Sequence, residues 1–191
     1  MSNTIERDRL IQIASQCEGM GSNVDIDKFA ELLGLEGAYK DALKVPFSCK
    51  QVNGKWQTKG VSTCGLVAEG IWHSAGIDIP NNWRPYSLSV PSIARAVKFA
   101  NQQTPRSAWQ TYVNDLRPEP GDYVIIGSGI YEHALTVVDW EDDMCVSIDG
   151  GQVDSKTGLQ CIKKCKRPWK NNSLGNRVVQ GWICIDMLPW I

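Results

Sequence analysis

The sequence predicts an α+β fold, because helical periodicity dominates the first part of the chain and short β-branched runs dominate the part that follows. Apolar residues recur at three- and four-residue steps over residues 4–17 and over Thr63–Ala75. Short runs at Tyr123–Ile126, Ala134–Val138 and Met144–Ile148 are separated by Gly-rich or acidic turns, as in neighbouring strands. We therefore expect helices packed on an antiparallel sheet.

The N-terminal part of the chain is expected to form two helices and a loop. The first helix covers residues 4–17, where the apolar positions share one face. A second, shorter helix takes Asp25 or Asp27 as its N-cap and ends at Gly34. Residues 46–63 are rich in polar and Gly positions, which indicates a loop or a weak hairpin.

The central helix carries Cys64 in its first turn and ends near Gly76. The segment after it is rich in proline and includes one helical stretch, Ser92–Gln102. We treat residues 80–118 as an insertion that shapes one wall of a cleft.

A chain of 191 residues is long enough for one domain with a substantial core and short for two. We expect a single domain over residues 1–191, with the N-terminal helices at 4–34. Its core region spans about residues 55–152 and contains the insertion at 80–118. No internal repeat or low-complexity tract is found in the sequence.

Composition argues against nucleic-acid and membrane partners. The 20 Lys and Arg residues nearly balance 21 Asp and Glu residues, so no long-range field attracts polyanions. No segment approaches the roughly 20 apolar residues that cross a membrane. The charged first twenty residues do not resemble a signal peptide, so we expect synthesis in the cytoplasm.

Seven cysteines are many for a cytoplasmic chain, and the odd number leaves one thiol available for chemistry. Zinc ligation would draw on Cys145, Cys161, Cys165 and Cys184. Zinc sites usually have two close cysteine pairs, and here only Cys161 and Cys165 are close, so we expect no metal and no other cofactor. Disulfides or buried thiols are the favoured interpretation, with disulfides forming only outside the cytoplasm.

Cys64 is the candidate nucleophile. A thiolate is stabilised at the start of a helix by unpaired N–H groups and by the positive end of the helix dipole. The alternative is that Cys64 is a small buried apolar residue, as free cysteines often are. A nucleophilic role requires a base nearby, so the histidines decide between the two readings.

The chain has two histidines, and His133 is the candidate base. His73 lies nine residues beyond Cys64 on the same predicted helix, and nine steps of about 100° place it on the opposite face. His133 opens a predicted strand after a Gly-Ser-Gly turn, where a rigid scaffold can hold its ring against a helix N-terminus.

Asp149 is the candidate third member of the site, with Gln152 as the alternative. If Glu141–Asp143 is a three-residue hairpin loop, Asp149 lies diagonally next to His133 on one face. A loop of two or four residues would change every side chain's face and bring Gln152 opposite His133. Asp149-Gly-Gly is also an ordinary turn signal, and this structural reading stays open.

The order of these motifs resembles the NlpC and CHAP branches of the papain-like cysteine hydrolases. Cys64 begins a helix, Pro120-Gly-Asp122 precedes a hydrophobic strand, and His133 starts the next strand. The resemblance covers about residues 55–152 and rests on these three short motifs. It implies a papain-like fold in which a polar residue on the following strand orients the imidazole, and it implies no cofactor.

This resemblance implies a cysteine peptidase or amidase that cleaves an amide bond in peptidoglycan peptides. The thiolate would attack a carbonyl, and the base would protonate the leaving amine. The backbone N–H of Cys64 is one candidate oxyanion donor, and the side chain of Gln57 is a weaker second one. An enzyme without an export signal must be delivered to the wall, so the chain is expected to be an antibacterial effector of a contractile (type VI) secretion apparatus or a lytic enzyme.

Such an effector would act in the periplasm or cell wall of a target cell and would imply a cognate immunity protein that plugs the cleft. Two other functions fit the same residues. One is a cytoplasmic cysteine protease or deamidase that acts on proteins. The other is a catalytically silent binding module, for which Cys64→Ala would change nothing.

Overall fold

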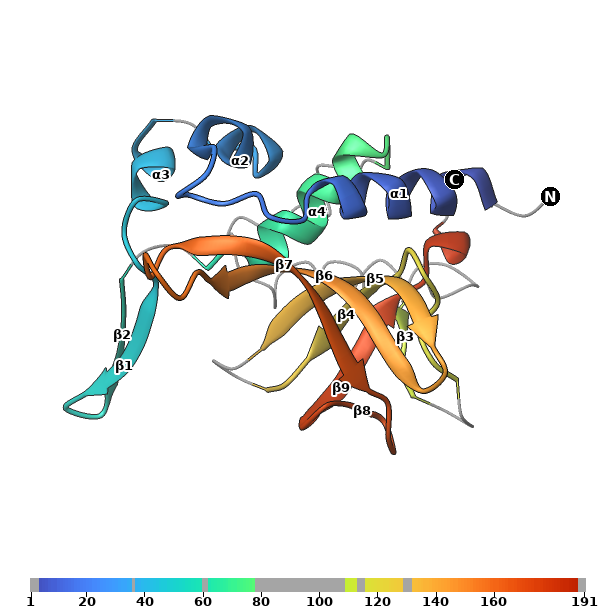
Figure 1. Ribbon diagram of the computed structural model, residues 1–191. Helices are drawn as coiled ribbons and strands as arrows, with labels where there is room; N and C mark the ends of the chain where they lie inside the picture. The colour runs from blue at the N-terminus through green and yellow to red at the C-terminus, as the bar shows by residue number, and fades with distance from the viewer. Residues whose placement is uncertain are drawn as a thin grey trace.

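The computed structural model describes residues 4–35, 37–59, 62–77, 109–112, 116–128 and 132–188. Residues 80–108 of the expected insertion, with the helical stretch Ser92–Gln102, lie outside the described residues. Within the described part the architecture is α+β, with helices packed on an antiparallel sheet as predicted (Figure 1). None of the described helices has the length and apolar character needed to span a membrane.

The helices are α1 (Thr4–Gln16), α2 (Ile26–Leu32), α3 (Gly37–Ala42), α4 (Cys64–Ser74) and the 3-10 helix η2 (Ile185–Met187). The strands are β1 (Ser48–Val52), β2 (Lys55–Lys59), β3 (Trp109–Gln110), β4 (Tyr123–Ile126), β5 (His133–Glu141), β6 (Met144–Val153), β7 (Gln160–Pro168), β8 (Ser173–Leu174) and β9 (Arg177–Ile183).

Helices α1, α2 and α4 form where the sequence predicts them. In α1, Leu10 and Ala14 are buried on the face that packs against the rest of the molecule. The α2 helix is capped by Asp25, whose side chain accepts a hydrogen bond of 3.1 Å from the Lys28 N–H. The polar segment before α4 forms the hairpin β1–β2, which is the second of the two structures predicted for residues 46–63. Helix α3 was not predicted.

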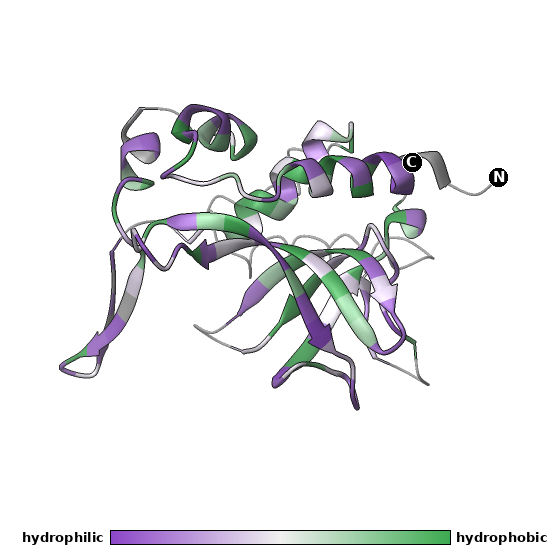
Figure 2. Cartoon of the chain, viewed as in Figure 1, coloured by the Kyte–Doolittle hydropathy of each residue, from purple (hydrophilic) through white to green (hydrophobic). Residues whose placement is uncertain are grey.

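The main sheet has the order β3-β9-β4-β5-β6-β7, and α1 and α4 lie on one of its faces (Figure 1). The β1–β2 hairpin extends away from this body. Strand β4 is buried on both faces, because Tyr123 and Ile125 pack toward the helices while Val124 and Ile126 pack into a second core. Figure 2 shows hydrophobic residues along α4 and the central strands.

The second core is enclosed because the sheet curls on itself. Strand β8 pairs with β9, and a bridge between Trp169 and Leu174 links the end of β7 to β8. The circuit from β9 through β4, β5, β6, β7 and β8 therefore closes at this end, like a small barrel. Leu135, Val137 and Trp182 fill its interior.

The β5–β6 hairpin differs from the prediction at its turn and agrees with it farther along. The turn has two residues, because Glu141 pairs with Met144, so the predicted three-residue loop is wrong. A β-bulge at Val138 then shifts the pairing by one residue. Beyond it Val137 pairs with Ser147, which is the register that a three-residue loop would have produced.

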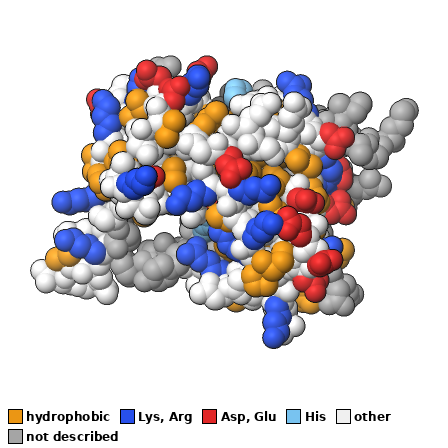
Figure 3. Space-filling view, in the orientation of Figure 1, with side chains coloured by type: hydrophobic (Ala, Val, Ile, Leu, Met, Phe, Trp, Pro, Cys, Tyr) orange, Lys and Arg blue, Asp and Glu red, His pale blue; other side chains and the backbone are white. Residues whose placement is uncertain are grey.

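The chain after Gln152 supplies β7, β8 and β9, which the sequence did not predict as strands. Lys163–Arg167 is a basic run typical of a solvated loop, yet it lies within β7 and pairs with β6. The strand alternation places Cys165 opposite Ser147 and Arg167 opposite Cys145. Near the centre of the face seen in Figure 3, Lys and Arg side chains lie among Asp and Glu side chains.

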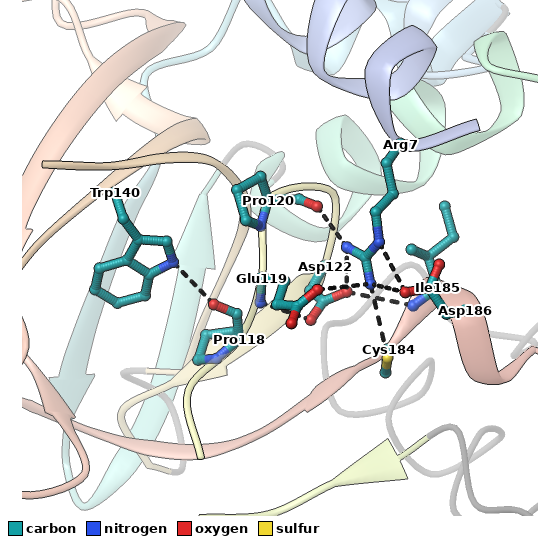
Figure 4. Close-up of polar contacts among 9 residues, drawn as sticks. All are labelled: Arg7, Pro118, Glu119, Pro120, Asp122, Trp140, Cys184, Ile185 and Asp186. Carbon is teal, nitrogen blue, oxygen red and sulfur yellow. Dashed lines mark hydrogen bonds and ion pairs between the residues drawn. The ribbon is translucent and has the colours of Figure 1, made fainter. Parts of the chain in front are cut away.

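A buried charge cluster ties both ends of the chain to the turn before β4 (Figure 4). Arg7 of α1 donates to the carbonyl oxygen of Pro120, to Asp122 at 3.1 Å and to Asp186 of η2 at 2.8 and 3.0 Å. Asp122 also accepts hydrogen bonds from the backbone N–H groups of Glu119 and Ile185. The Pro-Gly-Asp turn therefore serves as the anchor for α1 and η2.

Candidate active site

Three elements bring the predicted site residues together. Cys64 is the first residue of α4, His133 is the first residue of β5, and Asp149 lies on β6. All three side chains are buried, with relative exposures of 4%, 7% and 0%. Asp149 is part of a strand, so it is not the turn residue that its Asp-Gly-Gly context also allowed.

Two glycines allow α4 to begin directly against β6. A Cβ atom at Gly150 would lie 2.4 Å from the Val67 side chain and 2.8 Å from the Thr63 carbonyl oxygen. Gly151 has φ of 65°, and a Cβ there would lie 3.2 Å from the Cys64 nitrogen. The Gly151 N–H donates to the Thr63 hydroxyl at 2.9 Å. These contacts fix the helix start beside the strand that carries Asp149.

The Cys64 thiol is arranged to ionise. Burial by itself would raise its pKa, but a side-chain hydrogen bond and the positive charge of His133, the Ala134 N–H and the Ser62 hydroxyl outweigh burial and lower the pKa. Ser62 Oγ lies 3.5 Å from Cys64 Sγ. The start of α4 adds the helix dipole to these interactions.

His133 is held in its cationic form by two anionic neighbours. Burial would lower its pKa, but the hydrogen bonds to Asp149 and Cys64 raise it to about 9. Its Nε2 atom lies 2.6 Å from Asp149 Oδ2. Because an ionised carboxylate only accepts, Nε2–H donates to it, and the other ring nitrogen is left to face the thiol. Both shifts favour a thiolate on Cys64 and an imidazolium on His133 at the same pH.

Asp149 has all its acceptor positions occupied. Besides the His133 bond, Oδ1 accepts from Ser147 Oγ at 2.6 Å, and Arg167 donates to both oxygens at 3.3 and 2.6 Å. Burial would raise the pKa of Asp149, and the interactions with His133 and Arg167 lower it below its usual value. The carboxylate is therefore ionised and fixed in direction.

Gln152, the alternative third residue, also lies near the ring. Its Nε2 atom is 3.5 Å from His133 Nε2, against 2.6 Å for the Asp149 oxygen. An amide nitrogen cannot donate to a ring N–H, so the Asp149 contact is the stronger one. Both expected side chains thus reach the histidine, and Asp149 is the one that orients it.

The other two residues considered from the sequence, His73 and Gln57, lie apart from the cluster. His73 is exposed on α4, as its helical position predicted. Gln57 is exposed on β2, in the hairpin that extends away from the main body (Figure 1). Its place gives no support to a role as oxyanion donor, since a side chain on that hairpin points into solvent rather than toward the thiol.

The sequence reasoning missed Arg167 and Ser147. Both belong to strands whose alternation places them on the face of Asp149, and Arg167 also donates to Ser147 Oγ at 2.9 Å. Cys165 and Arg167 are two residues apart, as on one face of a strand, but Lys163, Lys164 and Lys166 beside them interrupt any apolar alternation. The density of positive charge hid this period.

A pocket of about 640 Å³ opens beside the cluster. His133, Gly151 and Gln152 form its inner wall. The opposite side is formed by the end of β7 and by the β8–β9 turn, including Lys166, Arg167, Leu174, Asn176 and Arg177. Because Gly151 lies against Cys64, the pocket adjoins the helix start.

The described residues contain no group of His, Cys, Asp and Glu side chains that could hold a metal ion. The six cysteines whose side chains are described, namely Cys17, Cys64, Cys145, Cys161, Cys165 and Cys184, are free thiols. The sulfur of Cys64 is therefore not bound in a disulfide and is available to His133.

The arrangement has the chemical parts of a nucleophilic thiol site: an ionisable sulfur at a helix start, a cationic imidazole and a fixed carboxylate. Such a site can form a thioester with an acyl group and return a proton to the leaving group. Compared with models of known protein families, with curated proteins and with solved structures, the chain gives no match.

Proposed function

We propose that this chain is a papain-like cysteine hydrolase of the NlpC and CHAP type, which cleaves an amide bond in peptidoglycan peptides. The observation that carries the proposal is the Cys64–His133–Asp149 cluster, in which the thiol pKa is lowered at a helix start. A buried structural cysteine has the opposite shift, as at Cys17, where burial raises the pKa to about 11.

The order of the elements supports the papain-like assignment. The thiol begins a helix, the histidine begins the second strand after the Pro-Gly-Asp turn, and the carboxylate lies on the strand after that. The resemblance in the sequence used these same three motifs. The substrate class rests on the resemblance alone.

In the proposed mechanism the Cys64 thiolate attacks the amide carbonyl and forms a tetrahedral intermediate. The backbone N–H of Cys64, at the positive end of α4, stabilises the oxyanion. His133 gives its proton to the leaving amine, and the C–N bond breaks to leave a thioester. His133 then takes a proton from water, which attacks the thioester and releases the acid. Asp149 holds the ring and stabilises its positive charge throughout.

Digestion of purified peptidoglycan, followed by mass spectrometry of the fragments, tests the proposal. The native chain is expected to produce new amine termini. Cys64→Ala is expected to produce none, although its melting temperature should equal that of the native chain. His73→Ala is the matched control, because it changes a histidine on the same helix outside the cluster. If the wall stays undigested while the Cys64 thiol still reacts with a thiol probe, the wall is rejected as the substrate and a protein substrate is favoured.

The proposal includes the place of action. We propose that the enzyme meets its substrate in the periplasm or wall of a target cell, as an antibacterial effector countered by an immunity protein that covers the cleft. Expression in a Gram-negative host with an added export signal should be toxic, and expression without the signal should not. Toxicity confined to the cytoplasm would instead support a protease or deamidase, and toxicity that survives Cys64→Ala would support a silent binding module.

A further inference from the structure

The residue before the proposed nucleophile, Thr63, departs from the usual start of a helix. It is the N-cap residue of α4 and is completely buried. A threonine at an N-cap ordinarily has an extended backbone, and its hydroxyl accepts a hydrogen bond from an N–H group of the first turn. Thr63 has φ of −102° and ψ of 0°, and its hydroxyl makes no capping bond. The helix that begins with Cys64 therefore lacks the cap that its sequence offers.

Two strands hold the Thr63 hydroxyl instead. It donates to Gln160 Oε1 of β7 at 2.8 Å and accepts from the Gly151 N–H of β6 at 2.9 Å. The same Gln160 oxygen accepts a hydrogen bond from the Thr63 backbone N–H at 3.0 Å. One carboxamide oxygen thus fixes both the backbone and the side chain of the residue before Cys64.

Gln160 is itself firmly placed in the fold. It is 2% exposed, and its backbone pairs with Val153 of β6. Its carbonyl oxygen accepts a hydrogen bond of 3.0 Å from the Ser22 N–H on the other side of the strand. Removal of the Gln160 side-chain oxygen would therefore leave two buried donors of Thr63 without their acceptor, while the strand itself keeps its neighbours.

Strand β7 is attached to both halves of the proposed site. Its first half passes the start of α4, where Gln160 binds Thr63 (Figure 1). Near its end, Arg167 donates to Asp149, which accepts from His133. Gln160 and Arg167 are an odd number of residues apart, so their side chains project from opposite faces of the strand. The strand carries no proposed catalytic residue, yet it contacts the elements that hold all three.

We infer that Gln160 is a positioning residue for the proposed reaction, which holds Thr63 in a conformation that does not cap α4 and so leaves the helix start open to the Cys64 sulfur. The inference rests on the proposed function. An oxygen that capped the first turn would accept from its N–H groups and offset part of the positive potential at the helix end. With the Thr63 hydroxyl bound elsewhere, that potential acts on the thiolate and on the oxyanion that forms beside it.

The pH profile of iodoacetamide alkylation at Cys64 tests the inference without a substrate, since the thiolate is the reacting form. Peptide mass spectrometry gives the rate at each pH. Gln160→Met keeps a side chain of similar size but removes the acceptor, so Thr63 is released to cap α4. We expect its profile to lie about one pH unit above that of the native chain, which is an about tenfold lower rate on the acidic side.

A double variant separates release of the hydroxyl from simple damage to the fold. Thr63→Val has no hydroxyl and cannot cap the helix, so it should shift the profile by less than half as much as Gln160→Met. Combined with Gln160→Met, it should return the profile most of the way to that of the native chain. A double variant displaced as far as Gln160→Met overturns the inference, and so does Thr63→Val displaced that far by itself.

Two further variants control the experiment. Thr136→Val makes the same exchange at a buried threonine of β5 whose hydroxyl has no hydrogen-bond partner in the described part of the chain, and it should leave the profile unchanged. Gln160→Asn withdraws the acceptor by one methylene. It should shift the profile in the same direction by a smaller amount, which gives an independent reading if Gln160→Met does not fold.

Wall digestion separates this inference from the proposed function. Gln160 is buried away from the substrate, so Gln160→Met should lower kcat about tenfold on the acidic side of the profile and leave KM unchanged. Digestion by the native chain together with an unshifted Gln160→Met profile rejects the positioning role and leaves the hydrolase intact. The expected shifts in a chain that does not digest the wall reject the hydrolase and leave Gln160 as the residue that positions a reactive thiol.

Discussion

Two buried arginine–aspartate pairs hold this fold together, and they differ in what else the aspartate contacts. In the first, Arg7 binds Asp122 and joins α1 to the turn before β4 (Figure 4). In the second, Arg167 binds Asp149 and joins β7 to β6. Asp122 also accepts hydrogen bonds from backbone N–H groups, whereas Asp149 accepts one from the ring of His133.

The difference changes the ionisation of the two carboxylates. Burial dominates at Asp122 and raises its pKa to about 6, although Arg7 and the backbone N–H groups of Glu119 and Ile185 act to lower it. At Asp149 the cationic His133 and Arg167 outweigh burial and lower the pKa. A buried ion pair alone is thus a structural tie, and it becomes a candidate catalytic unit when the carboxylate also orients a titratable ring.

Removal of the His133 ring should have the largest effect on activity and should separate the two aspartate pairs most clearly. On the proposed mechanism, His133→Ala is expected to lower wall hydrolysis by about 10³-fold or more, since it removes both the proposed general base and the cation that favours the thiolate. The melting temperature should change little, because Asp149 keeps Arg167 and Ser147. Initial rates of fragment release and thermal unfolding measure the two effects. His73→Ala should match the native chain, and equal losses in both variants would contradict the assignment.

Removal of the structural arginine should have the opposite profile. Arg7→Met leaves Asp122 buried without its cation, which should cost about 3 kcal/mol of unfolding free energy. Urea denaturation measures the loss, and Arg9→Met, an exposed position on the same helix, provides the control. Activity per folded molecule should be unchanged. If Arg7→Met lost kcat tenfold and kept the stability of the native chain, Arg7 would contribute to activity and not only to the fold.

Helices α1, α2 and α4 and the three central strands could be predicted because their signals are local. The spacing of apolar residues located α1 and α4, and the capping carboxylate located the start of α2. Strands β7 and β9 were missed, since their stability comes from pairing with distant strands and from closure of the barrel at Trp169 and Leu174. Such long-range pairing leaves little trace in a short window of sequence.

The contact between His133 and Asp149 was expected from the register, although one step of that argument was wrong. A two-residue turn should have moved Asp149 to the other face, and the bulge at Val138 restores it. The bulge has no clear signature in a run of β-branched residues. Arg167 could not be foreseen, because only the completed sheet shows that β7 lies beside β6.

Substitution of Asp149 should weaken the thiolate without removing the thiol. Asp149→Asn removes the charge that stabilises the imidazolium, so the pKa of Cys64 should rise toward its ordinary value. We expect about a 10²-fold loss of activity near neutral pH, part of which returns as the pH increases. The pH profile of iodoacetamide alkylation at Cys64 measures the shift. In the native chain this rate should stay level between the lowered pKa of Cys64 and the His133 pKa of about 9. An unshifted profile in the variant would remove Asp149 from the site.

The smallest expected effect is a difference in how the two aspartates link stability to pH. Asp122 has a raised pKa, so its contribution to stability is complete below the ordinary pKa and is lost as the pH rises through about 6. The stability difference between the native chain and Asp122→Asn should therefore grow by about 2 kcal/mol from pH 6.5 to pH 4. Asp149 has a lowered pKa, so its contribution persists over this range and is lost only at lower pH.

Urea denaturation of Asp122→Asn and Asp149→Asn over this pH range measures the two slopes. In the native chain and in Asp122→Asn, His133 stays protonated over the range, because its pKa lies at about 9. Parallel slopes for the two variants would show that the carboxylates share one electrostatic environment. In that case the contrast between a structural tie and a catalytic unit would rest on His133 alone. Divergent slopes would show that the fold holds one buried carboxylate against ionisation and the other in its ionised form, which is what an imidazolium partner requires.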